Sequence, residues 1–456
     1  MEQPVPPLSE KKTEMIRIKN ATIINEGRRF KANVLIDGER IKTIAPPSPG
    51  EEEADEEIDA EGLLLLPGCI DDQVHFREPG LTYKGDIHSE SRAAVAGGIT
   101  SFMDMPNTIP QTTTVEALND KFNRAAKESM ANYAFFIGAT NDNGEELKKK
   151  GAERAAAIKV FMGSSTGNML VDNEQTLEHI FAGTGKIVAV HCESETVIAA
   201  NKARFIRKAG ENPDITFHAK IRDAEACFRS SSEAVRLAKK YGTRLHIFHL
   251  STERELSLLE AKPLKEKRIT AEACIHHLWF CEDDCQEKGN LIKWNPAIKS
   301  RQDRDALRKA LIEGKIDVVA TDHAPHTLQE KEGSCLRAAS GGPMVQHALT
   351  VMLELCRQGV FTEELTVEKM AHAPAELFGI KDRGYIREGY YADLVLVNPH
   401  HAWTVGKENL LYKCGWSPLE GSTFANQVEK TFVNGRLVYD NGRFDENFRG
   451  KELVLL

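Results

Sequence analysis

Eight short apolar segments, separated by stretches with helical patterning, constrain the fold of this chain more than any other feature. They occupy residues 68–76, 100–107, 133–140, 156–162, 187–194, 244–251, 269–277 and 317–325. Nearly continuous hydrophobicity is typical of strands that are buried on both faces, as in a parallel sheet. Eight strand–helix units favour an α/β fold built on a closed (β/α)8 barrel over an open doubly wound sheet.

Both ends of the chain have β patterning instead. Residues 16–44 alternate apolar and polar side chains and contain Asp37-Gly38, a hairpin signal; residues 392–399 predict a strand, and residues 431–444 contain Asn434-Gly435 and Asn441-Gly442. Because an isolated hairpin is only marginally stable, we expect one small β-sandwich domain formed from both termini. The predicted parts are residues 1–66 and 386–456 for this domain and 67–385 for the barrel.

Composition excludes several classes of protein. The chain has 456 residues and a formal net charge of −9, which argues against a nucleic-acid or anionic-membrane surface but allows a local basic pocket. No stretch of about 18 apolar residues predicts a membrane span, and residues 1–15 lack the apolar core of a signal peptide. The nine cysteines are scattered, as is typical of free thiols. We therefore expect a cytoplasmic protein.

Polar side chains stand at or near the ends of nearly all the predicted strands. In a barrel these ends converge on one mouth, where active sites lie. A single histidine at such a place is more often a core residue than a ligand, but Lys159 and Asp322 interrupt apolar strands and need compensation for burial. Nitrogen and oxygen ligands together suit zinc with a position left for water. The residues are His75, Arg77, Asn107, Lys159, His191, His249, His276 and Asp322.

Eight motifs carry a family likeness that spans nearly the whole chain. They are PGCIDDQVHFREPG (67–80), DMPNT (104–108), IKVFMGSSTGNM (158–169), VHCE (190–193), HIFHLSTE (246–253), EACIHH (272–277), WNPAIKSRQDRDAL (294–307) and ATDHAPH (320–326). In this order they resemble the amidohydrolase superfamily and, more narrowly, its dihydroorotases. The resemblance implies a TIM-like metallo-hydrolase barrel.

The resemblance also implies a metal site. Its ligands would be His75, His191, His249, Asp322 and Lys159, holding one or two zinc ions. Lys159 matches a position that is N6-carboxylated in many relatives, where the carbamate bridges two metals. His246 precedes the matched ligand by three residues, and His276 matches a supporting position, with a structural role about equally good.

Substrate contacts follow from the same likeness. Arg77, Asn107 and His326 match contacts to a substrate carboxylate, and Asn295 matches a contact to a dihydropyrimidine ring. A planar guanidinium binds a carboxylate bidentately, which lysine cannot do. Allantoinases and dihydropyrimidinases share the barrel but act on substrates without this carboxylate, and they typically lack the motif that contains Arg77.

One position departs from the family pattern. The usual strand motif is D-x-H-x-H, whereas this chain has Gln73 in place of the first histidine. An amide oxygen is a weaker zinc ligand than imidazole. The site could hold one metal strongly, or Gln73 or Asp72 could compensate. Alternatively, the chain could be an inactive partner of aspartate transcarbamoylase. The presence of every other site residue favours activity.

The expected reaction is the reversible hydrolysis of the cyclic amide of (S)-dihydroorotate to N-carbamoyl-L-aspartate in de novo pyrimidine biosynthesis. Metal-bound hydroxide would attack the ring carbonyl, with Asp322 as general base and then general acid. The alternatives are another cyclic amidohydrolase, an allantoinase or dihydropyrimidinase, and the inactive partner. A small molecule is thus the expected substrate, and the resemblance suggests a homodimer.

Overall fold

A computed structural model describes residues 15–46, 52–163 and 168–456 of the chain. Residues 1–14 of the predicted N-terminal β part and residues 164–167 of the motif at 158–169 therefore lie outside the described residues. Within the described part, none of the helices is both long and apolar enough to cross a membrane. All nine cysteines are free, as predicted.

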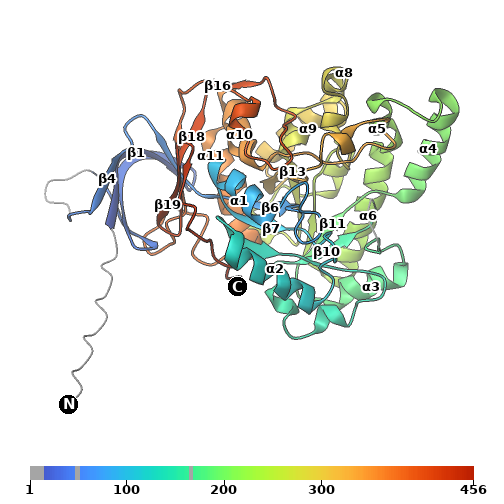
Figure 1. Cartoon of the computed structure of the whole chain (residues 1–456). Helices are drawn as coiled ribbons and strands as arrows, with labels where there is room; N and C mark the ends of the chain where they lie inside the picture. Colours follow the sequence, from blue (N-terminus) through green and yellow to red (C-terminus); the bar gives the residue numbers. More distant parts are fainter. Residues whose placement is uncertain (1–14, 47–51, 164–167) are drawn as a thin grey trace, which may run out of the picture.

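Eight parallel strands form the barrel in the centre of the molecule (Figure 1). Two arcs of paired strands meet where Phe136 N donates to Asp104 O, and where His75 N donates to His323 O over 2.7 Å. Nearly every residue of these strands is buried, which explains their continuous hydrophobicity and confirms the eight predicted strands. The strands are β6 (Cys69–Val74), β7 (Ile99–Asp104), β8 (Asn132–Phe135) continued by β9 (Ile137–Gly138), β10 (Ile158–Phe161), β11 (Val188–His191), β12 (Leu245–Ile247), β13 (Ile269–Cys274) and β14 (Val318–Ala320).

Helices cover the outside of the barrel (Figure 1). Helix α6 shows why they form: Asp223 caps its first turn by accepting from Ala226 N, small buried side chains recur every four residues, and Gly242 ends it at φ +69°. The bounds are α1 (Ile87–Ala96), α2 (Val115–Glu128), α3 (Glu174–Gly183), α4 (Glu195–Ala209), α5 (His218–Ile221), α6 (Ala224–Tyr241), α7 (Ile275–Trp279), α8 (Cys285–Lys288), α9 (Arg301–Ile312), α10 (Ala348–Arg357), α11 (Glu363–Val367) and α12 (Ala373–Phe378).

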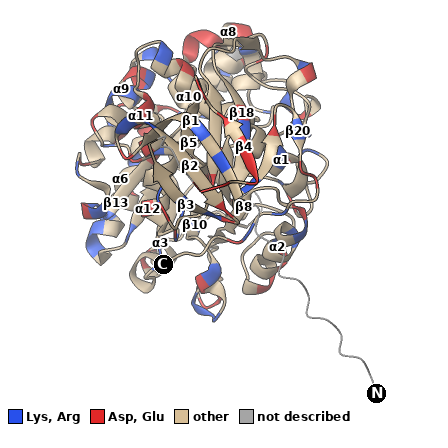
Figure 2. Ribbon diagram, turned by 90° about the vertical axis from the view of Figure 1, so that its left-hand side faces the viewer, with Lys and Arg blue, Asp and Glu red and all other residues tan. Residues whose placement is uncertain are grey.

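The two ends of the chain share one sheet beside the barrel, at the left of Figure 1. Its order is β20-β19-β18-β15-β5-β1-β2-β3, with β4 paired to β1. Figure 2 looks onto this sheet and shows Lys and Arg interspersed with Asp and Glu. The strands are β1 (Met15–Asn25), β2 (Arg28–Asp37), β3 (Arg40–Ala45), β4 (Glu56–Asp59), β5 (Leu64–Pro67), β15 (Leu394–Asn398), β18 (Gln427–Val433), β19 (Arg436–Asp440) and β20 (Arg443–Phe444); β16 (Trp403–Thr404) and β17 (Thr423–Phe424) form a separate pair.

Strand β15 joins this sheet to the barrel, because its side chains point alternately into the two cores. Leu394 and Leu396 pack into the core of the terminal sheet, whereas Val395 and Val397 pack into the main barrel core. Side chains of a strand alternate between faces, so one strand serves both cores. Strand β5 ends at Pro67 and β15 begins at Leu394, and the domain boundaries at 66/67 and 385/386 stay a prediction.

The predicted hairpin turns are present, and one of them is shifted by one residue along the chain. Asn434-Gly435 and Asn441-Gly442 form two-residue turns in which all four φ angles are positive, as a type I′ turn requires. In the hairpin between β2 and β3, the turn residues are Gly38 and Glu39 instead of Asp37 and Gly38, because Asp37 pairs with Arg40. Sequence analysis missed a further turn at residues 26–27, between β1 and β2.

Candidate active site

One cavity, of about 440 Å³, opens at the carboxyl ends of the barrel strands. Side chains from most of the eight strands or the loops after them reach it, although they lie far apart in the sequence. The structure brings together here nearly all of the predicted site residues. These residues are His75, Arg77, Asn107, Lys159, His191, His249, Asn295, Asp322 and His326.

Two histidines face each other across the base of this cavity. His191 Nδ1 lies 3.0 Å from His249 Nε2, and His191 Nε2 lies 2.9 Å from Glu193 Oε2. Glu193 also accepts from Arg222 over 2.5 Å. Burial lowers the pKa of both histidines, so both are neutral, which is the form that binds metal. With its Nε2–H donated to Glu193, His191 presents the Nδ1 lone pair towards His249.

A second pair comes from opposite ends of the barrel sequence. His75 Nε2 lies 3.0 Å from Asp322 Oδ1, and His75 Nδ1 lies 2.7 Å from Asn107 Oδ1. Because the Asn107 oxygen can only accept, His75 donates through Nδ1 and directs the other ring nitrogen at Asp322. Asn107 therefore orients a histidine in addition to its predicted contact with substrate.

Lys159 enters the cavity from β10. Its Nζ lies 3.9 Å from the ring centre of Phe248 and 4.8 Å from that of Phe161, and it forms no hydrogen bond to a described residue. Burial lowers the pKa of Lys159 to about 7, against the opposing effect of nearby carboxylates such as Glu272 and Asp322. A substantial fraction of this amine is therefore neutral and nucleophilic near pH 7.

A cationic group occupies the opposite side of the cavity. Arg77 is 6% exposed; its Nε donates to Pro325 O over 3.0 Å, and one terminal nitrogen donates to His326 Nε2 over 3.1 Å. Lys84 Nζ donates to Glu330 Oε1 over 2.9 Å. Among the described residues no carboxylate lies within ion-pair distance of Arg77. A buried guanidinium without a counter-ion is costly, so this side of the cavity suits an anionic ligand.

Three of these side chains stand on left-handed backbone. The φ angles are +71° at Arg77, +39° at His249 and +45° at Asp322. Residues with a Cβ rarely adopt this conformation, and such strain concentrates at functional sites. All three residues lie two or three positions beyond the end of a strand, in the loops that line the cavity.

These residues fit a zinc site in their chemistry, because imidazole nitrogen and carboxylate oxygen are ordinary zinc ligands. Comparison with known proteins shows the family. The model of the Amidohydrolase family matches residues 64–438. The chain belongs to the amidohydrolase family.

Relatives of this amidohydrolase act on more than one ring. A dihydroorotase of Halobacterium salinarum is 34% identical over 427 residues, covering 93% of this chain and 97% of the relative. An allantoinase of Bacillus velezensis is 31% identical, covering 93% and 94%. The solved L-hydantoinase (dihydropyrimidinase) of Arthrobacter aurescens aligns with a TM-score of 0.90 at 26% identity, covering 95% and 97%. The chain is thus a hydrolase acting on cyclic amides.

Gln73, the departure from the family pattern, lies at the base of the amidohydrolase cavity. Its Oε1 accepts from Cys274 Sγ over 3.6 Å. The amide oxygen is therefore hydrogen-bonded to a neighbour on β13, and no hydrogen bond among the described residues holds it towards His75 or Asp322. This geometry supports a site whose metal is held by the remaining residues.

Two further predicted residues lie around the aromatic ring of Trp294, which lines the cavity. His276 stacks on this ring with 4.3 Å between ring centres and 12° between planes, a geometry that fits a supporting position. Asn295 lines the cavity itself, and its Oδ1 is buried without a hydrogen bond to any described residue. That acceptor is available to a ring N–H.

Sequence analysis missed three charged residues of the site. Glu193 ends the motif VHCE. It could have been found in the same way as Lys159, because it is a charged residue near the end of a buried strand. Lys84 follows the Arg77 motif and is buried against His326. Arg222 lies just after α5, and no local pattern distinguishes it from a surface arginine.

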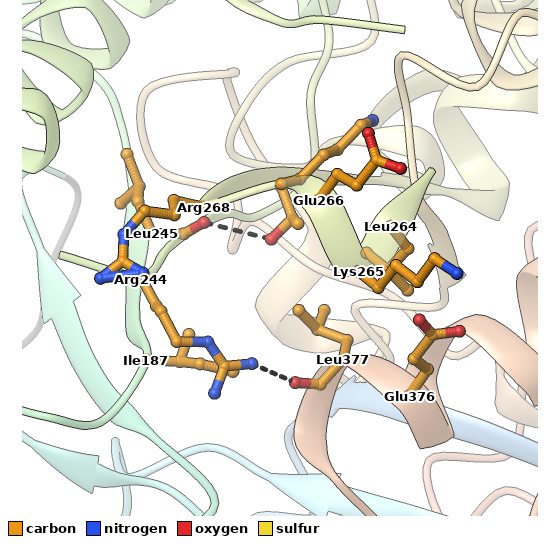
Figure 3. A pocket seen from close by; sticks show the side chains of 11 residues that line it. Ile187, Arg244, Leu245, Leu264, Lys265, Glu266, Arg268, Glu376 and Leu377 are labelled. Atoms are coloured by element: carbon orange, nitrogen blue, oxygen red, sulfur yellow. Dashed lines mark hydrogen bonds between the residues drawn. The ribbon is translucent and has the colours of Figure 1, made fainter. Parts of the chain in front are cut away.

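Another cavity, also of about 440 Å³, lies near the amino ends of β11, β12 and β13 (Figure 3). Two of its charged side chains are engaged by the backbone: Arg244 donates to Leu377 O over 2.7 Å, and Arg268 donates to Gly242 O over 3.0 Å. None of the predicted site residues lines it. The predicted site residues thus lie at the opposite end of the barrel.

Proposed function

We propose that this amidohydrolase is a dihydroorotase, which reversibly hydrolyses the cyclic amide of dihydroorotate to N-carbamoyl-L-aspartate. The observation that carries the proposal is Arg77, a buried cation in the cavity with no carboxylate partner among the described residues. A substrate carboxylate would supply the missing counter-ion. Allantoin and hydantoin rings carry no such group, so their hydrolases have no use for a buried arginine at this place.

The chain's own residues would bind this substrate from two sides. Arg77 would bind the carboxylate bidentately, with the Asn107 amide and the His326 ring beside it. Asn295 Oδ1 would accept from a ring N–H. Such fixed placement converts an encounter into a near-intramolecular reaction, and it contributes much of the rate in enzymes of this kind.

His75, Lys159, His191, His249 and Asp322 would hold zinc at the base of the cavity. Bound zinc would supply a Lewis acid that polarises the amide carbonyl and lowers the pKa of water. The neutral Lys159 amine can add to carbon dioxide with loss of one proton, which gives a carbamate. This reaction gives the buried side chain an anionic oxygen donor, and it draws the amine away from its costly ammonium form.

Asp322 would transfer the proton. Its carboxylate takes a proton from the attacking water as the new C–O bond forms, and returns it to the ring nitrogen as the C–N bond breaks. The reverse sequence closes the ring. The hydrogen bond that His75 donates to Asn107 keeps the other ring nitrogen of His75 aimed at Asp322.

The test is a side-by-side assay of the isolated, zinc-loaded chain on dihydroorotate, allantoin and hydantoin. We expect dihydroorotate to give the highest kcat/KM, and we expect Arg77→Lys to raise its KM roughly 10- to 100-fold because charge-assisted bonds are lost. A preference for allantoin or hydantoin would overturn the proposal in favour of another cyclic amidohydrolase. Absence of turnover on every ring would favour the silent partner of aspartate transcarbamoylase.

A further inference from the structure

A cluster of ionisable side chains lies inside the barrel, beneath the candidate active site. Asp72 on β6, His246 on β12 and Glu272 on β13 are all fully buried, and each offers a ligand atom within 4.8 Å of the others. Glu272 accepts from His249 N over 3.1 Å, which places the cluster one layer below the cavity. On its other sides His246 packs edge-on against Phe248 and Phe378.

The ring of His246 is held in one orientation by a hydroxyl group. Its Nδ1 lies 2.9 Å from Thr270 Oγ1, and Thr270 donates its own proton to Leu245 O over 3.1 Å. Thr270 Oγ1 must therefore accept, and His246 Nδ1 donates. A histidine that donates one ring N–H to a fixed acceptor is typical of metal ligands, because this contact leaves the other nitrogen with its lone pair.

That other nitrogen faces two carboxylates. His246 Nε2 lies 3.3 Å from Glu272 Oε2 and 3.5 Å from Asp72 Oδ2. A single proton on Nε2 can point well at only one of these oxygens. Both oxygens of Asp72 are buried and form no hydrogen bond to a described residue, although a buried carboxylate ordinarily needs several donors.

We propose that Asp72, His246 and Glu272 bind a divalent cation of the zinc class, at a site separate from the metal site of the cavity. The two carboxylates carry the charge that a divalent ion neutralises, and the His246 ring would bind the ion through Nε2 once that nitrogen has lost its proton. Ligands at about 2.0–2.2 Å from zinc in a tetrahedral site lie roughly 3.4 Å from one another, which matches the separations around His246 Nε2. The ion would bridge three strands and stabilise the barrel.

Gln73, where this chain departs from the family pattern, directly follows Asp72 in the sequence. Gln73 removes an imidazole from the cavity, whereas Asp72, the residue before it, directs a carboxylate into the barrel interior. Cys274 joins the two levels, since its Sγ lies 3.6 Å from Gln73 Oε1 and 3.7 Å from Glu272 Oε1.

The first test counts zinc in the full-length chain after dialysis against a chelator. In a His249→Asn background, which removes a proposed ligand of the cavity metal, we expect about one zinc per chain to persist because the cluster is closed to solvent. Adding Asp72→Asn should remove this ion and lower Tm.

The matched control is Asp71→Asn. Asp71 is a buried carboxylate on the same strand that is hydrogen-bonded to Thr321 and lies outside the cluster, so this variant should keep the ion. Equal zinc content with and without the Asp72→Asn change would overturn the proposal.

The second test does not depend on any variant folding. Crystals of the unmodified chain grown with Zn²⁺ are measured at the zinc absorption edge. An anomalous peak between Asp72, His246 and Glu272 supports the proposal. A map without a peak at this place overturns it and leaves a protonated histidine between two carboxylates. Both tests are independent of turnover, so they stand whether or not dihydroorotate proves to be the substrate.

Discussion

Arg77, His249 and Asp322 share a backbone conformation that is rare for residues with a Cβ. Each costs on the order of 1–3 kcal/mol, and the surrounding contacts must offset this cost. His249 N donates to Glu272 and His75 N donates to His323 O, so the strained segments are fixed by neighbours on other strands. Strain at three converging positions supports the cavity as the site of chemistry.

Asp322 is the residue on which the proposed proton transfer depends. Asp322→Asn keeps the shape of the side chain but cannot take up a proton at neutral pH. We expect kcat for dihydroorotate to fall about 10²- to 10⁴-fold, with a smaller change in KM. Steady-state kinetics of the zinc-loaded variant measure this, and near-normal kcat would contradict the role given to Asp322.

Glu193 acts through His191 and is a positioning residue. Glu193→Gln removes the charge that holds His191 Nε2–H and leaves Arg222 facing a neutral amide. We expect the affinity of the cavity for zinc to fall roughly 10- to 100-fold, measured by competition with a coloured chelator. Glu195→Gln, at an exposed position two residues further along, is the control and should leave the affinity unchanged. Equal affinity in both variants would assign Glu193 a purely structural role.

At the scale of elements, the turns show how the two termini are joined. Gly435 N donates to Ala392 O, and a Cβ built on Gly435 would overlap the carbonyl oxygen of Gly38. Gly442 has a similar φ, +87° against +76°, but a Cβ there would have no neighbour within 4 Å. A side chain at Gly442 would therefore meet backbone strain alone, whereas a side chain at Gly435 would meet the same strain and a steric overlap.

This pair gives a matched experiment on stability. Gly442→Ala should lower the free energy of unfolding by about 1 kcal/mol, the cost of a Cβ on left-handed backbone. Gly435→Ala should lower it by more, because the hairpins must also move apart. Urea denaturation measures both values. Equal losses would mean that the hairpins at Gly38 and Gly435 can separate without cost.

We expect His347, in the segment before α10, to make the stability of the fold depend on pH. His347 Nδ1 lies 2.8 Å from the Tyr412 hydroxyl group, and burial lowers the pKa of His347 to about 3 from the ordinary value of 6.5. Between these values the unfolded chain binds a proton that the folded chain does not. Stability should therefore fall as pH falls from 6.5 towards 3, by up to about 1.4 kcal/mol per pH unit.

His347→Asn tests this linkage, since Asn keeps a polar group near Tyr412 but does not titrate. We expect its free energy of unfolding to depend less steeply on pH between about 4 and 6.5 than that of the unmodified chain. Denaturant titrations at several pH values supply the comparison. Parallel pH profiles would show that His347 takes up its proton equally in both states.

At the scale of the whole molecule, the sequence predicted what local patterns encode. Each barrel strand carries its own hydrophobic run. Once these strands are known to close into a ring, the proximity of Lys159, His191 and Asp322 follows from their places at the strand ends. The contact between Asp72 and His246 could not be predicted this way, because β13 and β14 separate their strands in the barrel and the contact depends on how far each side chain reaches into the interior. Arg222 is missed because it follows a short helix, where no local pattern distinguishes it from a surface arginine.

Strand β15 makes a prediction about cooperativity, because its alternate residues belong to two cores. Leu394→Ala removes contacts from the core of the terminal sheet and Val395→Ala removes contacts from the barrel core, at a cost of about 2–5 kcal/mol for the leucine. If the strand couples the two cores, both variants should lower the midpoint of one shared transition, followed by tryptophan fluorescence and by release of zinc from the cavity. Two separate transitions, of which Leu394→Ala moved only one, would show that the terminal sheet and the barrel unfold independently. In that case the shared strand would contribute to each core without transmitting stability between them.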